Sequence, residues 1–143
     1  MEQRVSIVTL GVRDVDLARE FYEALGWRGQ EVERTVFFQA GGMAVVLWGR
    51  DQLAEDAGAT PGPGAGGGIA LAHNVRSESE VDDVIEAARS AGATVTREPA
   101  ATFYGGYAGC FTDPDGHLWE IAYNPGLPLA EDGSITIPEM GTP

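Results

Sequence analysis

Apolar residues follow two different periods along the chain, and the order of these periods predicts the secondary structure. Residues 5–12 alternate between the two sides of a predicted strand. Residues 14–25 repeat their apolar positions every three or four residues, which predicts an amphipathic helix ended by Gly26. Residues 36–39 and 43–48 predict two strands joined as a hairpin. The beginning of the chain is therefore expected to fold as strand, helix and hairpin.

The second half of the chain repeats this order. Residues 69–75 predict a strand, and the Ser-x-x-Glu capping box at 77–80 opens a second amphipathic helix. A short strand is expected at 94–97, followed by strands at 107–112 and 117–123 that flank an Asp-Pro-Asp-Gly turn. Repetition of one unit predicts an α+β fold built from two βαβββ modules.

The segment between the two repeats differs in composition from both. Residues 49–68 are rich in Gly, Pro and Ala and predict a flexible linker. Because no lysine follows the glycines, a phosphate-binding loop is not expected there. We therefore divide a single domain into module one (1–48), this linker, module two (69–123) and a Pro/Gly-rich tail (124–143).

Composition narrows the possible partners. The chain of 143 residues has a net charge of −13, which argues against a nucleic acid or an anionic membrane as partner. All nine basic residues are arginine, so a lysine Schiff base is excluded. No apolar run reaches the length of a membrane-spanning helix, and the N-terminus lacks the pattern of a signal peptide. We expect a soluble, cytoplasmic protein.

Three segments together resemble the vicinal oxygen chelate superfamily, which contains glyoxalase I, bleomycin-resistance proteins and extradiol dioxygenases. They are VTLGVRDVDLAREFYEALG (8–26), IALAHNVRSESEVDDVIEAARSAG (69–92) and FTDPDGHLWEIAYNP (111–125). The resemblance implies that the two modules form a curved mixed sheet with helices on its convex face. It also implies a functional site on the concave face and a homodimer.

Enzymes of this superfamily usually bind a divalent metal through four side chains, two from each module. The positions that match these ligands are Ile7, Val46, Gly68 and Glu120, so only the last one can bind a metal. A single carboxylate cannot hold a catalytic divalent ion, because such sites need about three protein ligands. We therefore expect no cofactor.

The remaining candidate ligands do not restore this site. His73 shares strand parity with the residues expected to face the helices, and His117 is expected in or beside the turn, pointing away from Glu120. Cys110 is the only cysteine, which excludes a cysteine-built metal site and an intrachain disulfide. Asp113 is better explained by the turn than by catalysis.

Strand alternation also separates the two sides of the predicted sheet. One side carries large apolar residues and is expected to lie under the helices. These residues are Val8, Leu10, Val12, Val45, Leu47, Ile69, Leu71, Trp119 and Ile121. The opposite side carries mainly small residues, which leaves room for a ligand. The predicted ligand-binding residues on this side are Ile7, Thr9, Val46, Trp48, Gly68, Ala70 and Glu120.

The loop sequence FYGGY supplies three further candidates for ligand binding. Phe103, Tyr104 and Tyr107 are expected over the mouth of the pocket, where aromatic rings would stack on a planar ligand. Alternatively, these rings are surface turn residues, and Trp48 packs against a second subunit or the linker. Arg13 or Tyr107 is an internal donor that could meet the carboxylate of Glu120.

These features favour a metal-free protein that binds a small molecule over an enzyme. It would resemble the bleomycin-resistance group and sequester an antibiotic or another planar, aromatic or cationic natural product. The alternative is a glyoxalase-like lyase or isomerase, or a dioxygenase, with displaced metal ligands or with Glu120 as general base. A third possibility is an enzyme-derived domain that is retained for an unrelated interaction.

Overall fold

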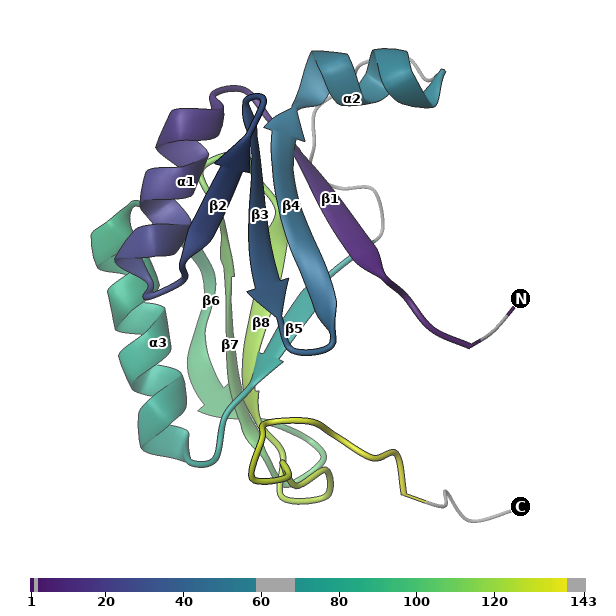
Figure 1. Cartoon of the computed structure of the whole chain (residues 1–143). Coiled ribbons are helices and arrows are strands. Elements are labelled where there is room, and N and C mark those ends of the chain that lie inside the picture. Colours follow the sequence, from purple (N-terminus) through teal and green to yellow (C-terminus); the bar gives the residue numbers. More distant parts are fainter. Residues whose placement is uncertain (2, 59–68, 139–143) are drawn as a thin grey trace.

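Figure 1 shows the computed structural model, which describes residues 1, 3–58 and 69–138. In these ranges the chain forms eight strands and three helices. The strands of module one are β1 (Ile7–Val12), β2 (Gly29–Val32), β3 (Thr35–Ala40) and β4 (Met43–Gly49). Those of module two are β5 (Leu71–Asn74), β6 (Thr94–Ala101), β7 (Tyr107–Thr112) and β8 (Leu118–Tyr123). The helices are α1 (Val15–Ala24), α2 (Arg50–Ala57) and α3 (Glu78–Ala91).

The two modules have the same topology. Sheet one has the strand order β1-β4-β3-β2 and sheet two the order β5-β8-β7-β6. The first strand of each module pairs in parallel with the last, and the other pairs are antiparallel. A parallel pair needs a long crossover, and α1 and α3 lie in these crossovers. The predicted α+β fold of two repeated βαβββ modules is confirmed, with two four-stranded mixed sheets.

The helix caps expected from the sequence are present. The side chain of Asp14 accepts hydrogen bonds from the backbone amides of Asp16 and Leu17 at the start of α1. Ser77 accepts one from the amide of Glu80 at the start of α3, and Gly92 ends that helix with φ of 108°. Local side-chain chemistry therefore defines both crossover helices.

The prediction that residues 49–68 form a flexible linker is wrong for its first part. Residues Arg50–Ala57 form α2, which ends at Gly58 with φ of 67°. A Cβ atom placed on Gly11 would lie 3.1 Å from Cβ of Arg50 and 3.3 Å from the side chain of Leu53. This close approach seats α2 on sheet one, a tertiary contact that composition did not indicate. Residues 59–68 of the predicted linker lie outside the described residues.

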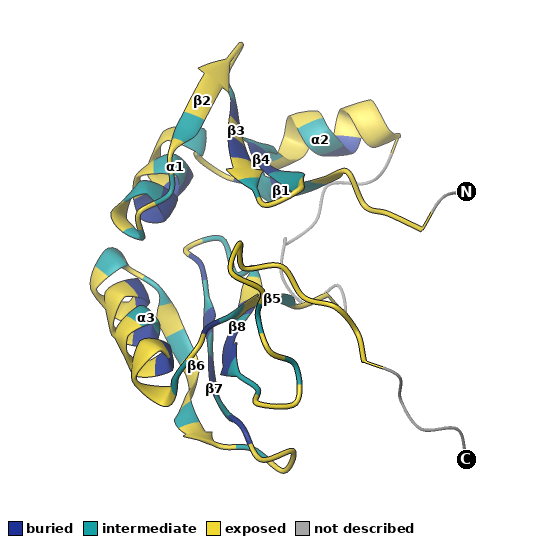
Figure 2. Ribbon diagram, turned by 60° about the horizontal axis from the view of Figure 1, so that its bottom comes forward, coloured by how far each residue is buried: buried dark blue, intermediate teal, exposed yellow. Residues whose placement is uncertain are grey.

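One hydrophobic core joins the two modules. It combines helix-facing residues of sheet one, such as Leu47, with Trp119 and Ile121 of sheet two. Rings of α1 and of the segment after it reach sheet two: the centroid of Trp119 lies 6.2 Å from that of Tyr22 and 5.8 Å from that of Trp27. Figure 2 shows the modules stacked with α1 and α3 on the same flank. The other side of each sheet therefore faces away from this shared core.

Strand alternation assigned most of the helix-facing layer correctly, with one exception. Ile69 is 76% exposed and precedes β5, because this strand begins only at Leu71. Among the described residues, no helix is long and apolar enough to cross a membrane.

The described part of the tail folds back on module two. The guanidinium of Arg76 donates hydrogen bonds to the carbonyl oxygens of Ala130 and Glu131, at 2.8 and 3.2 Å. A turn at this anchor is closed by a 2.8 Å hydrogen bond from the amide of Ala130 to the carbonyl of Ser134. The tail therefore becomes part of the wall around β5 and β8.

Candidate functional site

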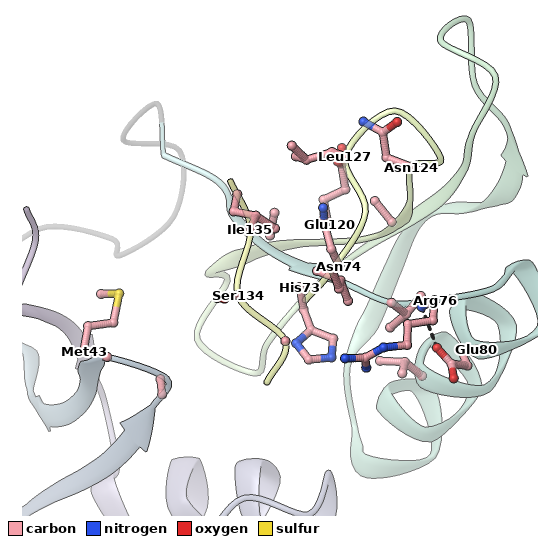
Figure 3. Close-up of a pocket in the computed structure, with 18 of the residues that line it drawn as sticks. Met43, His73, Asn74, Arg76, Glu80, Glu120, Asn124, Leu127, Ser134 and Ile135 are labelled. Atoms are coloured by element: carbon pink, nitrogen blue, oxygen red, sulfur yellow. Dashed lines mark hydrogen bonds between the residues drawn. The ribbon is translucent and has the colours of Figure 1, made fainter. Parts of the chain in front are cut away.

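A large cavity of about 1090 Å³ borders sheet two. Its walls come from β5, β8, the start of α3 and the tail, with a contribution from the β3–β4 turn of module one. Figure 3 shows Glu120, Asn124 and Leu127 on one side of β5 and His73 and Arg76 on the other. The cavity therefore surrounds the edge strand β5 and reaches the side of sheet two that faces away from the core.

Glu120 is the acidic residue of β8 in this cavity. In the register of sheet two it lies opposite Ala72 of β5 and Cys110 of β7. Its side chain is half-buried, and within the described ranges it forms no hydrogen bond or ion pair. Ala122, the next residue on the same side of β8, is also small. Small neighbours thus leave the carboxylate accessible to a ligand.

The charges around the cavity are mainly negative. Glu80 and Asp83 of α3 line it together with Glu120. The one arginine in the lining, Arg76, is hydrogen-bonded to the tail. Burial lowers the pKa of His73 and outweighs the charge of Glu80, which alone would raise it. The imidazole is therefore neutral at pH 7. The cavity therefore favours a ligand with a positive charge.

A second carboxylate, Asp113, is buried at the β7–β8 turn. Its Oδ2 accepts a 2.6 Å hydrogen bond from the hydroxyl of Tyr22 and lies 2.8 Å from Nδ1 of His117. Its Oδ1 accepts from the backbone amides of Asp115 and His117, at 3.0 and 2.8 Å. The indole of Trp119 donates to the oxygen of Tyr22 at 3.2 Å. This buried network joins α1 of module one to the turn of module two.

The network shifts the pKa values of its members. Burial alone would raise the pKa of Asp113, but hydrogen bonds from His117 and Tyr22 outweigh it and lower the pKa. Burial alone would lower the pKa of His117, but the hydrogen bond and charge of Asp113 outweigh it and raise the pKa. Burial, with the nearby charge of Asp113, raises the pKa of Tyr22 far above its ordinary value. Asp113 and His117 therefore form a pair within the β7–β8 turn, and the hydroxyl of Tyr22 connects this turn to module one.

Sequence comparison identifies the family. The model of the Glyoxalase/Bleomycin resistance protein/Dioxygenase superfamily matches residues 4–121. The chain belongs to this superfamily. The resemblance to the vicinal oxygen chelate proteins, which include these groups, is thereby confirmed. A comparison with curated protein sequences gives no significant match.

Several solved structures are similar to the chain. A glyoxalase-related enzyme from Fulvimarina pelagi is 39% identical, with a TM-score of 0.88 over 94% of this chain and 98% of that chain. A hypothetical protein from S. aureus is 25% identical, with a TM-score of 0.76 over 86% and 94% of the two chains. The fosfomycin resistance protein FosX from Mesorhizobium loti is 20% identical, with a TM-score of 0.65 over 87% and 94%, and shows the same fold.

The metal-binding positions of the superfamily do not fit a metal here. Ile7 is 53% exposed and Val46 is buried, and neither side chain can bind a metal. Gly68 lies outside the described residues and has no side chain to offer. Across the described ranges no group of three or more His, Cys, Asp and Glu side chains is close enough to share an ion. Of the two cross-strand partners of Glu120, Ala72 and Cys110, the cysteine has a side chain that can bind a metal.

The structure brings two of the ten predicted ligand-binding residues to the large cavity, namely Glu120 and Tyr104. Trp48 instead lines a second cavity, of about 740 Å³, together with Arg34 and Gln52. Ile7 and Thr9 lie in β1, on the same side of sheet one as Val46. Ala70 is exposed just before β5. Within a single chain, the predicted residues of sheet one therefore do not meet Glu120.

The remaining loop aromatics take different positions. The side chain of Phe103 is fully exposed. The hydroxyl of Tyr107 donates a 2.7 Å hydrogen bond to Asp82 of α3. Arg13 donates from its backbone amide and from Nε to Asp115, at 2.9 and 3.2 Å. Neither donor expected for Glu120 thus reaches it, because both are bound elsewhere.

Sequence reasoning missed the cavity residues outside regular strands. Glu80 was interpreted only as part of a helix cap, and its Oε2 does accept a 2.6 Å hydrogen bond from the amide of Arg76. Leu127 and Ile135 of the tail carry no periodic pattern that would have placed them at a site. The acidic residues at the start of α3, directly after β5, are the sequence signal that could have indicated a negatively charged site there.

Proposed function

We propose that the chain is a small-molecule-binding protein that takes up a cationic or planar aromatic compound without a metal, as antibiotic-sequestering proteins of the bleomycin-resistance type do. The observation that supports this most is Glu120, a carboxylate that has no partner among the described residues and lies in an acid-lined cavity of about 1090 Å³. A ligand amine would give that carboxylate the donor that the described residues do not supply. Sequestration in the cytoplasm is part of this proposal.

A homodimer is the second part of the proposal. On the side of sheet one that faces away from the core, Ile7 is 53% exposed, Phe37 40% and Val32 58%. The register places these three apolar residues on one side of sheet one. A second copy that covers this side with its own sheet two would bring Ile7, Thr9 and Trp48 to the partner's Glu120. Members of this superfamily are often dimers, which supports the arrangement.

Light scattering tests the dimer directly. We expect a mass of twice 15.1 kDa at micromolar concentration. Phe37→Glu should shift the protein toward the monomer, since it places a charge on the apolar side of sheet one. The exposed Phe103→Glu serves as a control that keeps the mass unchanged. A wild-type mass of 15.1 kDa would contradict the proposed arrangement.

The ligand-binding proposal is tested with Glu120→Gln, which keeps the shape of the side chain and removes its charge. A thermal-shift screen of planar and cationic natural products first identifies a ligand. The substitution should weaken a cationic or hydrogen-bonded ligand by about 1–3 kcal/mol, the usual loss for a bond to a charged group. Glu55→Gln, on the exposed surface of α2, makes the same charge change away from the cavity. Equal binding by wild type and Glu120→Gln would contradict the assigned site.

An enzyme is the competing function, and the similarity to a glyoxalase-related enzyme over 94% of the chain favours it. It would be a lyase, isomerase or dioxygenase that uses metal ligands other than the matched positions, or one that uses Glu120 as general base. Elemental analysis of the purified protein separates these cases. One equivalent of a divalent metal, with a melting temperature that falls on chelation, would contradict the metal-free binding protein.

A further inference from the structure

A smaller cavity, of about 210 Å³, lies between the two modules. Its walls come from the end of α1 and the segment after it, from β7 and β8, and from the exposed flank of α3. Four of the residues that line it are aromatic: Tyr22, Trp27, Phe111 and Trp119. A cavity of about 150 Å³ can hold one benzene ring, so this one has the size for a single six-membered ring with a short substituent.

The polar atoms of the buried aromatic walls are already bound. The hydroxyl of Tyr22 donates to Asp113, and the indole of Trp119 donates to Tyr22. The rings of Phe111 and Trp119 are stacked at 6.4 Å between centroids, and Trp27 meets Trp119 edge-on at 84°. The cavity therefore offers ring faces and edges to a ligand and few hydrogen-bonding groups.

The rim of the cavity carries one charge. Asp83 of α3 lines the rim and, within the described ranges, forms no hydrogen bond or ion pair. The other titratable side chain at the rim, His73, is neutral at pH 7 because burial lowers its pKa. A carboxylate next to aromatic faces favours a cation, since both attract positive charge.

We propose that this inter-module cavity binds a monocyclic aromatic amine in its protonated form, with the ring against Trp27 and Trp119 and the ammonium group at Asp83. The site is separate from the one at Glu120, although His73, Asp83 and Val84 line both cavities. Because Glu120 lines only the larger cavity and Ala87 only the smaller one, the two sites can be tested independently.

Nuclear magnetic resonance of the three indole N–H groups tests the site in the full chain. Trp27 and Trp119 line the small cavity, whereas Trp48 lines another cavity and would report on the proposed site at the partner's Glu120. We expect 2-phenylethylamine to shift the Trp27 and Trp119 signals saturably, whether or not the Trp48 signal moves. The uncharged 2-phenylethanol should bind more weakly, and phenylacetate more weakly still. No saturable shift of Trp27 and Trp119 with the amine would overturn the proposal.

Two variants then locate the ligand. Asp83→Asn should weaken 2-phenylethylamine about three- to fivefold, the upper range for a solvent-accessible ion pair, and leave 2-phenylethanol unchanged. Glu78→Gln, also on α3 but outside the cavity lining, is the matched control. Equal amine binding by wild type and Asp83→Asn would remove Asp83 from the site and contradict the proposal.

Ala87→Leu provides the steric test. Ala87 is exposed on α3, so leucine is compatible with the helix and fills the cavity. We expect this variant to lose the indole shifts, while Glu120→Gln keeps them. The reverse result would place the amine in the larger cavity, which would overturn this inference and leave the proposed function at Glu120 intact.

Discussion

Asp113 lies at the β7–β8 turn and Glu120 in the strand that follows, yet their surroundings differ completely. Asp113 is 4% exposed and accepts hydrogen bonds from Tyr22 and from two backbone amides, with the ring of His117 beside it. Glu120 is half-buried and, in the described part of the chain, has none. Two carboxylates in one hairpin thus serve different purposes, according to the donors that reach them.

The difference follows from local geometry. At the turn, the backbone amides of Asp115 and His117 donate to the carboxylate of Asp113, and α1 brings the hydroxyl of Tyr22 from the other module. On β8, the cross-strand neighbours of Glu120 are Ala72 and Cys110, which offer no strong donor. A buried carboxylate without donors would be costly, so Glu120 depends on solvent or a ligand. Asp113 is therefore held by the fold, whereas the carboxylate of Glu120 is accessible to a ligand.

The largest effect is expected for Asp113→Ala. Removing this carboxylate leaves the hydroxyl of Tyr22 and the ring of His117 without their buried partner. The free energy of unfolding should fall by about 3–5 kcal/mol, as for other broken buried ion pairs. Urea denaturation measures the loss. Glu120→Ala is the matched control and should change stability by no more than about 0.5 kcal/mol. Similar losses for both variants would remove the distinction between the two acids.

A smaller effect is expected for Trp48→Ala, which compares the two sheets. If sheet one of a second copy completes the site at Glu120, this change should weaken a planar ligand by about 0.5–1.5 kcal/mol. The ligand identified with the Glu120→Gln experiment is the probe, and isothermal titration calorimetry gives the affinity. Arg34→Ala, which alters the same polar cavity beside Trp48, is the control. Unchanged affinity in Trp48→Ala would confine the site to module two.

The smallest effect concerns pH and the two histidines of the chain. The pKa of His117 is raised above its ordinary value of 6.5, so the ion pair stabilises the fold fully below pH 6.5 and less as pH rises through the raised pKa. The pKa of Asp113 is lowered, so this contribution is also lost in acid below 3.8. His73 has a lowered pKa and should titrate below 6.5.

Proton resonance titration of the two imidazole rings measures this difference. We expect the ring of His117 to lose its proton at a higher pH than the ring of His73. In His117→Asn, the decrease of unfolding free energy between pH 6 and pH 9 should become shallower. Identical titration of both rings near 6.5 would contradict the ion pair at the β7–β8 turn.

Much of the fold could be predicted from local patterns. The period of two placed Leu47, Trp119 and Ile121 in the core, and the repeat predicted both modules. The pattern failed at α2, whose sequence lies beside a Gly- and Pro-rich segment and has only a weak apolar stripe of its own. Its position depends on the contact with Gly11, which no local pattern reveals.

The candidate site could be predicted only in part. Strand parity placed Glu120 on the side away from the core, and the structure lines a cavity with it. The same parity grouped Glu120 with Ile7 and Trp48, because alternation states which side of a strand a residue occupies and not which sheet it meets. Within one chain these residues lie on different sheets.

The sequence by itself determined the α+β modules and the superfamily, because these depend on residue identity and on periods within one strand or helix. Only the tertiary structure decided that the carboxylate of Asp113 is hydrogen-bonded and that the carboxylate of Glu120 lines a cavity. These outcomes rest on contacts between distant residues: Tyr22 and Asp113 are 91 positions apart, and Arg76 and Ala130 are 54 apart. Such contacts form when modules and tail pack together, and no local period encodes them.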